Sequence, residues 1–225
     1  ELLEKTKRTK LLVTSRERLH LKEEWIFEVH GLDCSIDARS EKTLDLSVFE
    51  ATQLFLYTAK RAVPDFAADT AESVLIARIC QAVGGMPLAI ELAAAWVRFL
   101  SCQEILYEIE HDLDILHTAW RDVPERHHSI RAVFAHSWKL LSPVGQHAFA
   151  RMTVFSGSFT RQAAAEVTGA SLTTLIDLVD KSFLRCPKAN HFTLHKLLKQ
   201  SGREMLHENA EEWNATCLKH ARYYA

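Results

Sequence analysis

The amino-acid sequence predicts a mainly α-helical protein that begins with the remnant of a parallel α/β sheet, continues as a four-helix unit and ends in a helical domain with a β-hairpin wing. Three observations support this fold class. Apolar residues recur at helical spacing over most of the 225 residues. Serine or aspartate stands where most of these helices begin. Two short alternating runs flank a Pro-Lys-Ala-Asn turn, as in a β-hairpin.

Residues 1–40 are predicted to be the C-terminal end of an α/β nucleotide-binding type of core. Within them, the apolar run Lys10–Arg16 indicates a buried parallel strand whose carboxyl end presents Thr-Ser-Arg. A second strand is expected at residues 25–29. The residues alone leave open that the first run is any buried strand followed by a turn. Because the chain begins with Glu1, in what looks like a helix, we also expect it to be a fragment.

Residues 41–120 are predicted to form a helical domain of four helices. Capping boxes, in which Ser or Asp is followed three residues later by Glu, mark helix starts at Ser47, Asp69 and Ser101. The first of these helices is expected to stop at Pro64, because proline cannot continue a helix.

The turn Gly84-Gly85-Met86-Pro87 is expected to form a fixed corner between two of these helices. Glycine enters the left-handed cap of a helix at little cost, and proline at the first helical position loses no hydrogen bond. The following helix, from Leu88 to about Leu100, is apolar over most of its surface. It should therefore be buried on several sides as the core helix of the domain.

Residues 121–208 are predicted to be a winged-helix domain, and residues 209–225 the start of a helical repeat array. Ser129 and the pair Ser142-Pro143 have the chemistry of helix starts. Further helices lead into the hairpin, and a last helix of the domain begins near His195. Helices followed by a hairpin and another helix have the element order of a winged helix.

Composition excludes several classes of protein. The 27 Lys and Arg nearly balance the 29 Asp and Glu, so the whole chain has no electrostatic preference for nucleic acid or an anionic membrane. No apolar run has the roughly 18 to 20 residues of a membrane helix. The five cysteines are scattered without a CxxC pair, which indicates reduced, structural thiols. We expect a soluble, cytoplasmic protein without a metal site or a catalytic residue of its own.

Five short stretches, in order along the chain, resemble motifs of the NB-ARC and LuxR/AfsR-like (STAND) signalling ATPases. Gly85–Ile90, with Gly-Met-Pro-Leu-Ala-Ile, resembles the GLPLA motif, and Leu11–Arg16 is similar to the sensor strand. Val179–Leu184 resembles the LVDKSLL turn into the wing, and Leu194–Leu198 resembles the MHD motif. Lys219–Ala225 looks like the beginning of the tetratricopeptide-type repeats that often follow in this family.

The resemblance implies a set of nucleotide-binding residues: Thr14, Arg16, Pro87 and His195. In the family, the sensor arginine reaches the terminal phosphate, the proline contacts the adenine, and the histidine contacts the inner phosphate of bound ADP. Lys196 stands where the MHD motif has aspartate, which leaves the role of the histidine better supported than the capping role of the aspartate.

The implied function is that of a nucleotide-sensing segment in a bacterial transcriptional regulator, in which the winged helix closes on ADP and is released by exchange for ATP. No G-x-x-x-x-G-K-[ST] phosphate loop occurs in the chain, and no acidic strand precedes the sensor strand. The parent protein is expected to be an ATPase that holds ADP or ATP with Mg²⁺. This chain alone should be inactive and bind no cofactor. Its expected partners are an upstream phosphate-loop half of the same polypeptide, downstream helical repeats and, on activation, further copies of itself.

Two alternatives remain open. A winged helix often binds DNA, but the helix before the wing, residues 171–181, carries two aspartates and one lysine and would repel a duplex. The chain could also be a helical protein-interaction scaffold whose motifs reflect packing alone.

Overall fold

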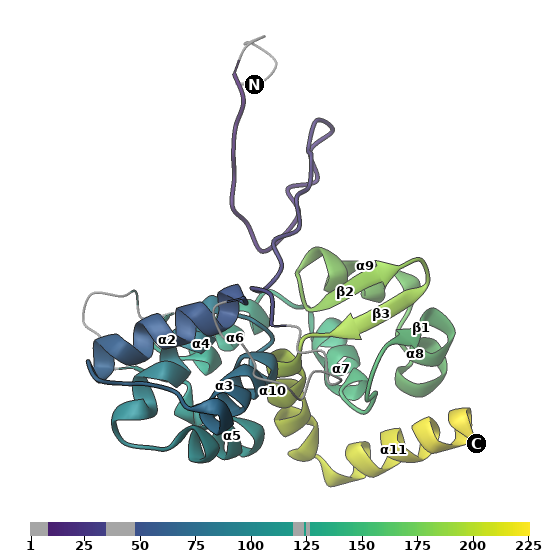
Figure 1. Ribbon diagram of the computed structural model, residues 1–225. Coiled ribbons are helices and arrows are strands. Elements are labelled where there is room, and N and C mark those ends of the chain that lie inside the picture. The colour runs from purple at the N-terminus through teal and green to yellow at the C-terminus, as the bar shows by residue number, and fades with distance from the viewer. Residues whose placement is uncertain (1–8, 35–47, 119–123, 125–126) are drawn as a thin grey trace.

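The computed structural model describes residues 9–34, 48–118, 124 and 127–225. Two mainly helical bodies lie side by side, and an extended N-terminal arm, residues 9–30, projects away from them (Figure 1). No helix within the described ranges is long and apolar enough to cross a membrane.

The first body, which we call the helical unit, follows the order predicted from the capping residues. Its elements are α2 (Glu50–Ala62), α3 (Thr70–Ala82), α4 (Pro87–Ala95), the 3-10 turn η1 (Trp96–Arg98), α5 (Cys102–His111) and the 3-10 turn η2 (Leu113–Ile115). The capping boxes at Asp69 and Ser101 are confirmed. Ser47 lies outside the described residues, and α2 follows Phe49, which has no capping side chain.

Helix α4 is the core helix of the helical unit, as its composition predicts. Its buried residues are Ala89, Ile90, Leu92, Ala93 and Ala94. It packs mainly against α2, which contributes the fully buried Phe55. The α-helix ends at Ala95, earlier than the expected Leu100, because the chain tightens into η1. There the indole of Trp96 donates to the Ile115 carbonyl at 2.6 Å and joins the two 3-10 turns.

The second body, which we call the wing unit, combines helices with a small antiparallel sheet. Its elements are α6 (Ile130–Trp138), α7 (Pro143–Met152), β1 (Phe159–Thr160), α8 (Arg161–Thr168), α9 (Leu172–Asp180), β2 (Leu184–Lys188), β3 (His191–Leu194), α10 (Lys196–His207) and α11 (Ala210–Tyr224). The sheet order is β1-β3-β2, so the predicted hairpin is confirmed. Strand β1 has two residues, too few to show an alternating pattern in the sequence.

Aromatic side chains dominate the core of the wing unit. Phe183, just before β2, packs edge to face on Phe149 of α7, with ring centroids 5.0 Å apart. Trp138 and Phe134 of α6 stack at 5.2 Å and complete the cluster. Each such pair stabilises the fold by roughly 0.5–1.5 kcal/mol beyond the contribution from its buried surface area. The turn into the wing is thereby fixed to two helices.

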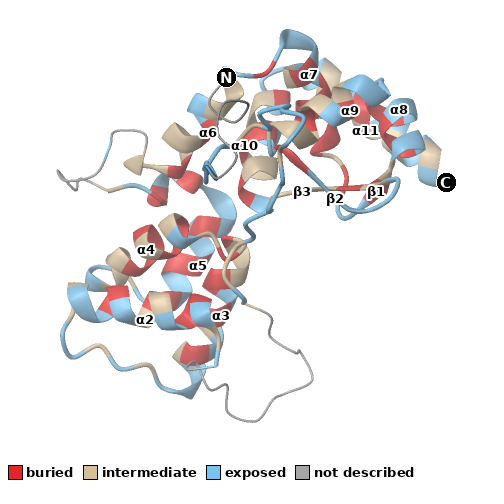
Figure 2. Ribbon diagram, turned by 90° about the horizontal axis from the view of Figure 1, so that it is seen from above, coloured by how far each residue is buried: buried red, intermediate tan, exposed pale blue. Residues whose placement is uncertain are grey.

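The predicted remnant of a parallel sheet is wrong for the described residues. Neither Lys10–Arg16 nor residues 25–29 forms a strand, and the sheet that does form is antiparallel and lies in the wing unit. Leu12 is 99% exposed and Trp25 is 97% exposed, and Figure 2 shows the arm mostly in the exposed colour. A parallel strand needs hydrogen bonds from neighbouring strands and helices over both faces. The described residues supply neither to this arm.

The two bodies have separate hydrophobic clusters, and two residues of the wing unit join the other one. Ile130 of α6 and Leu197 of α10 are buried in the cluster of the helical unit. Phe134, one turn after Ile130, belongs to the cluster of the wing unit. Helices α6 and α10 therefore connect the bodies. The domain boundaries at residues 40, 120 and 208 stay predictions.

Candidate functional site

The pair Gly84-Gly85, which we call the glycine corner, ends α3 in the predicted way. Both glycines have left-handed backbone, with φ of 65° and 67°, and the Gly85 amide donates to the Cys80 carbonyl at 2.9 Å. Pro87 follows as the first residue of α4 and is exposed. The cap and the proline at the first helical position are therefore confirmed.

The end of the N-terminal segment, residues 31–34, crosses the glycine corner at very short range. The Leu32 amide donates to the Gly85 carbonyl at 2.8 Å. A Cβ atom added to Gly85 would lie 2.2 Å from the Leu32 carbonyl oxygen, and one added to Gly31 would lie 2.4 Å from the Gly84 carbonyl oxygen. Backbone meets backbone here, so only glycine fits at these two positions.

The imidazole of His195 lies against Gly84. A Cβ atom added to Gly84 would be 2.7 Å from Nε2 of His195. His195 is the N-cap of α10, and its Nδ1 accepts a hydrogen bond from the Leu197 amide at 3.3 Å. The ring therefore caps its own helix and directs Nε2 at the glycine corner. The stretches that resemble GLPLA and MHD thus meet in space.

His195 is held in its neutral form. Burial is the largest cause that lowers its pKa, to about 4, and the nearby charges of Arg185 and Lys196 act in the same direction. Hydrogen bonding to the Gly84 backbone opposes the shift. Because Nδ1 accepts the Leu197 amide, this bonding pattern assigns the proton to Nε2. The ring can donate one directed hydrogen bond at the corner but brings no charge.

Lys196 brings a positive charge to the same place. Its Nζ donates to the Gln81 carbonyl at the end of α3, at 3.2 Å. The Gln81 amide group in turn donates to the Cys34 carbonyl at 3.0 Å. The start of α10, the end of α3 and residues 31–34 therefore converge at the glycine corner. The lysine links the two bodies from the position where the MHD motif has aspartate.

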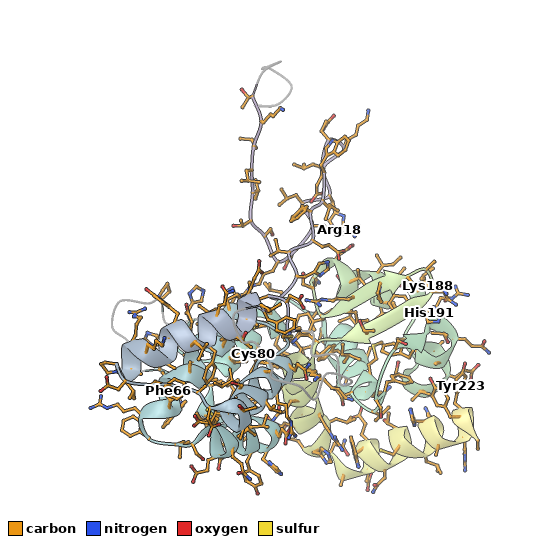
Figure 3. The ribbon with its side chains drawn as sticks, in the orientation of Figure 1. Arg18, Phe66, Cys80, Lys188, His191 and Tyr223 are labelled. Atoms are coloured by element: carbon orange, nitrogen blue, oxygen red, sulfur yellow. The ribbon has the colours of Figure 1, made fainter. Side chains whose placement is uncertain are left out.

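The other predicted nucleotide-binding residues do not join this site. Arg16 lies against α6, where its Nη1 donates to the Ser137 hydroxyl at 2.7 Å, and Thr14 is exposed. Next to it, Arg18 pairs with Asp180 of α9, with Nε and Oδ1 3.1 Å apart, so the base of the arm is fixed to the wing unit (Figure 3). In the structure, His195 therefore lies against the glycine corner just before Pro87, whereas Arg16 lies against α6.

The titratable side chains of the described residues offer no metal site, because no group of three or more His, Cys, Asp or Glu could hold an ion. The cysteines are free thiols. Burial raises the pKa of Cys80 to about 12, as for an unreactive structural thiol.

Sequence reasoning missed two residues of this region. Gly31 allows the close crossing of the glycine corner, and a lone glycine between His30 and Leu32 was its only signal. Arg131 joins three carboxylates between the two bodies, and nothing in its sequence surroundings distinguishes it from a surface arginine.

No protein-family model matches the chain. A protein of Mycobacterium tuberculosis described as a putative HTH-type transcriptional regulator is 31% identical over 183 residues, which cover 78% of this chain and 21% of that protein. A Mycobacterium bovis protein of the same description gives the same values. An uncharacterized protein of Mycobacterium tuberculosis is 30% identical over 222 residues, 93% of this chain and 53% of that protein. The chain is similar to part of a named regulator. It spans about a fifth of that regulator's length and about half of the other relative's.

Proposed function

We propose that this chain is a nucleotide-sensing segment of a signalling ATPase of the NB-ARC or LuxR/AfsR-like kind, within a bacterial transcriptional regulator. In this proposal the wing unit is a winged-helix domain that closes on bound ADP and is released when ATP replaces it. The observation that carries the proposal is the contact between His195 and Gly84, because it joins two motifs that are far apart in the sequence.

The chemistry of the corner suits a phosphate. The N-terminus of α10 presents backbone N–H groups and a favourable dipole to an anion. The Nε2 proton of His195, which is hydrogen-bonded to the Gly84 backbone in this structure, would become a directed donor to a phosphate that replaces that bond, and Lys196 adds charge. These donors all belong to the start of α10, which lies against the glycine corner of the helical unit, so a phosphate bound to them would lie where the two bodies meet. Its loss or replacement would therefore change how firmly α10 stays on the glycine corner.

Three further findings support the proposal. The named relatives are described as HTH-type transcriptional regulators. The order of helices and strands in the wing unit, with the sheet order β1-β3-β2, is compatible with a winged helix. The arm exposes large apolar side chains, among them Trp25 and Phe27, which an upstream phosphate-loop half of the polypeptide would cover. Bound ADP or ATP with Mg²⁺, downstream helical repeats and self-association on activation belong to the same proposal.

The first prediction separates this chain from the protein that contains it. The 225 residues alone should hydrolyse no ATP and bind ADP weakly at most, because they contain no phosphate loop. Isothermal titration calorimetry checks this, and micromolar ADP affinity of the isolated chain would contradict it.

In the full-length protein, bound ADP should slow amide exchange at the glycine corner and at Leu197. Identical amide exchange at these positions with and without nucleotide would contradict the proposed nucleotide-sensing function.

DNA binding by the wing unit is the competing function, and the description of the named relatives favours it. That match covers 21% of the relative and does not locate its helix-turn-helix. In this chain, the helix before the wing is α9, which exposes Leu172, Thr173 and Ile176. Asp180 at its end is paired with Arg18. The cations described at this surface, Arg18 and Lys181, are each paired with an aspartate of α9, so the helix offers little unpaired positive charge to a phosphate backbone.

The second prediction follows from that surface. We expect no salt-sensitive DNA affinity, that is, none that falls as the salt concentration rises. An acidic and apolar helix would release few of the counterions condensed on DNA. A mobility shift with random duplex at low ionic strength is sufficient. Tight binding that weakens with added salt would make the wing unit a DNA-binding domain.

A further inference from the structure

One guanidinium binds three carboxylates where the two bodies meet. Arg131, in the first turn of α6, contacts Asp114 through Nε, and its Nη2 lies 3.0 Å from Oδ1 of Asp112. The same side chain donates two hydrogen bonds to Glu204 of α10, from Nη1 to Oε2 at 2.5 Å and from Nη2 to Oε1 at 3.2 Å. We call these four residues the Arg131 cluster.

The Arg131 cluster lies on the same interface as His195 but at a separate point of α10. Asp112 and Asp114 belong to the helical unit, at the end of α5 and in η2, whereas Glu204 lies on α10. Glu204 follows His195 by nine positions, which is about 13 Å along a helix. Helix α10 is therefore tied to the helical unit near its N-terminus and again in its second half.

The arginine of the Arg131 cluster keeps its three carboxylates from repelling one another. Three negative groups surround one positive group, and the hydrogen bond from the Asp114 amide and the charge of Arg131 both lower the pKa of Asp112. Without the guanidinium, Glu204 would face the two aspartates of the helical unit with no cation between them. The side chains are between 39% and 65% exposed, so this repulsion is open to screening by salt.

We propose that the Arg131 cluster is an electrostatic contact that holds α10 on the helical unit and sets how readily the two bodies separate. Only the functional consequence of this contact, the release of the wing unit, rests on the proposed function. The contact itself requires no nucleotide, so it can be tested on the chain alone, and a failure of nucleotide sensing would leave the test intact.

The experiment is amide hydrogen exchange on the 225-residue chain and its Arg131→Met variant, which keeps the aliphatic stem and removes the charge. Exchange of α10 amides and of the glycine corner is expected to accelerate about five- to thirtyfold, while the core of α4 keeps its protection. The acceleration should shrink in about 1 M NaCl, where the Debye length is near 3 Å, because salt screens the carboxylates from one another.

Two further variants define the contact. Adding Glu204→Gln to Arg131→Met should restore much of the protection of α10, because it removes the repelling carboxylate. The matched control is Arg78→Met, which breaks an exposed ion pair with Glu110, 4.0 Å long, within the helical unit. It should leave α10 unchanged.

Several outcomes would overturn the proposal: unchanged exchange of α10 in Arg131→Met, an acceleration that salt does not reduce, or a double variant no better protected than the single one. If Arg131→Met does not fold, Arg131→Lys takes its place, since it keeps the charge and loses the two-pronged grip on Glu204. It should accelerate exchange of α10 about two- to fivefold, and wild-type exchange in that variant would equally remove the proposal.

Discussion

Replacing His195 by alanine in the full-length protein is expected to weaken ADP retention about ten- to a hundredfold and to leave the fold intact. The reason is the proposed hydrogen bond from Nε2 to a charged phosphate, which is worth roughly 1.5 to 3 kcal/mol. Loss of the Nδ1 cap on the Leu197 amide adds a cost of about 1 kcal/mol in stability. Dissociation rates of labelled ADP from the wild type and the variant measure the effect, and basal activity should rise in parallel.

The matched control for this substitution is His191→Ala. His191 lies on the same strand–helix segment, its Nδ1 contacts the Ala189 carbonyl, and it sits toward the end of the wing away from the helical unit (Figure 3). Its loss should leave ADP dissociation unchanged. Equal ADP dissociation in wild type and His195→Ala contradicts the phosphate role. A large loss of stability in the nucleotide-free His195→Ala variant would assign the histidine to packing and capping alone.

Acidification gives an independent check on the same histidine. Its pKa is about 4 in the folded chain, below the ordinary value near 6.5, so the unfolded chain binds the proton more tightly. The stabilisation from the neutral ring is thus complete above pH 6.5 and is lost as the pH falls toward 4. The order of magnitude is 3 kcal/mol. Wild type should therefore lose more stability than His195→Ala between pH 7 and pH 5.

The parts of this fold that the sequence predicts are those with local causes. Asp69 and Ser101 begin their helices because each side chain bonds an amide three residues ahead. The glycine corner turns because its own backbone requires positive φ. The hairpin follows from residues that are neighbours along the chain. In each of these cases, the interaction that decides the structure lies within a few residues of the pattern.

The candidate site depends on contacts between distant segments, and these had no local pattern. His195 could be placed at a helix start, but its contact with Gly84 depends on how α10 packs on α3. The arm fails as a predicted strand for a related reason, because an apolar run specifies burial without specifying a partner. Arg16 bonds α6 through Ser137, and neither residue carries a motif for this pairing.

The largest structural effect is expected for Gly85→Ala, which should destabilise the chain by about 2–4 kcal/mol. Left-handed backbone, with φ of 67°, costs an alanine roughly 1–2 kcal/mol. The new Cβ atom would also lie 2.2 Å from the Leu32 carbonyl oxygen, so residues 31–34 must move and the hydrogen bond from Leu32 to Gly85 is lost, at about 1 kcal/mol or more. Thermal melting should show a decrease of roughly 5 to 15 °C.

Two other glycines separate the causes of that effect. Gly169 has φ of 77° with nothing within 4 Å of an added Cβ atom, so Gly169→Ala measures backbone strain alone, about 1–2 kcal/mol. Gly31 has no positive φ, but its Cβ atom would lie 2.4 Å from the Gly84 carbonyl oxygen, so Gly31→Ala measures the crowding alone. If Gly85→Ala costs no more than Gly169→Ala, residues 31–34 yield freely. Residues 31–34 would then not be fixed to the glycine corner.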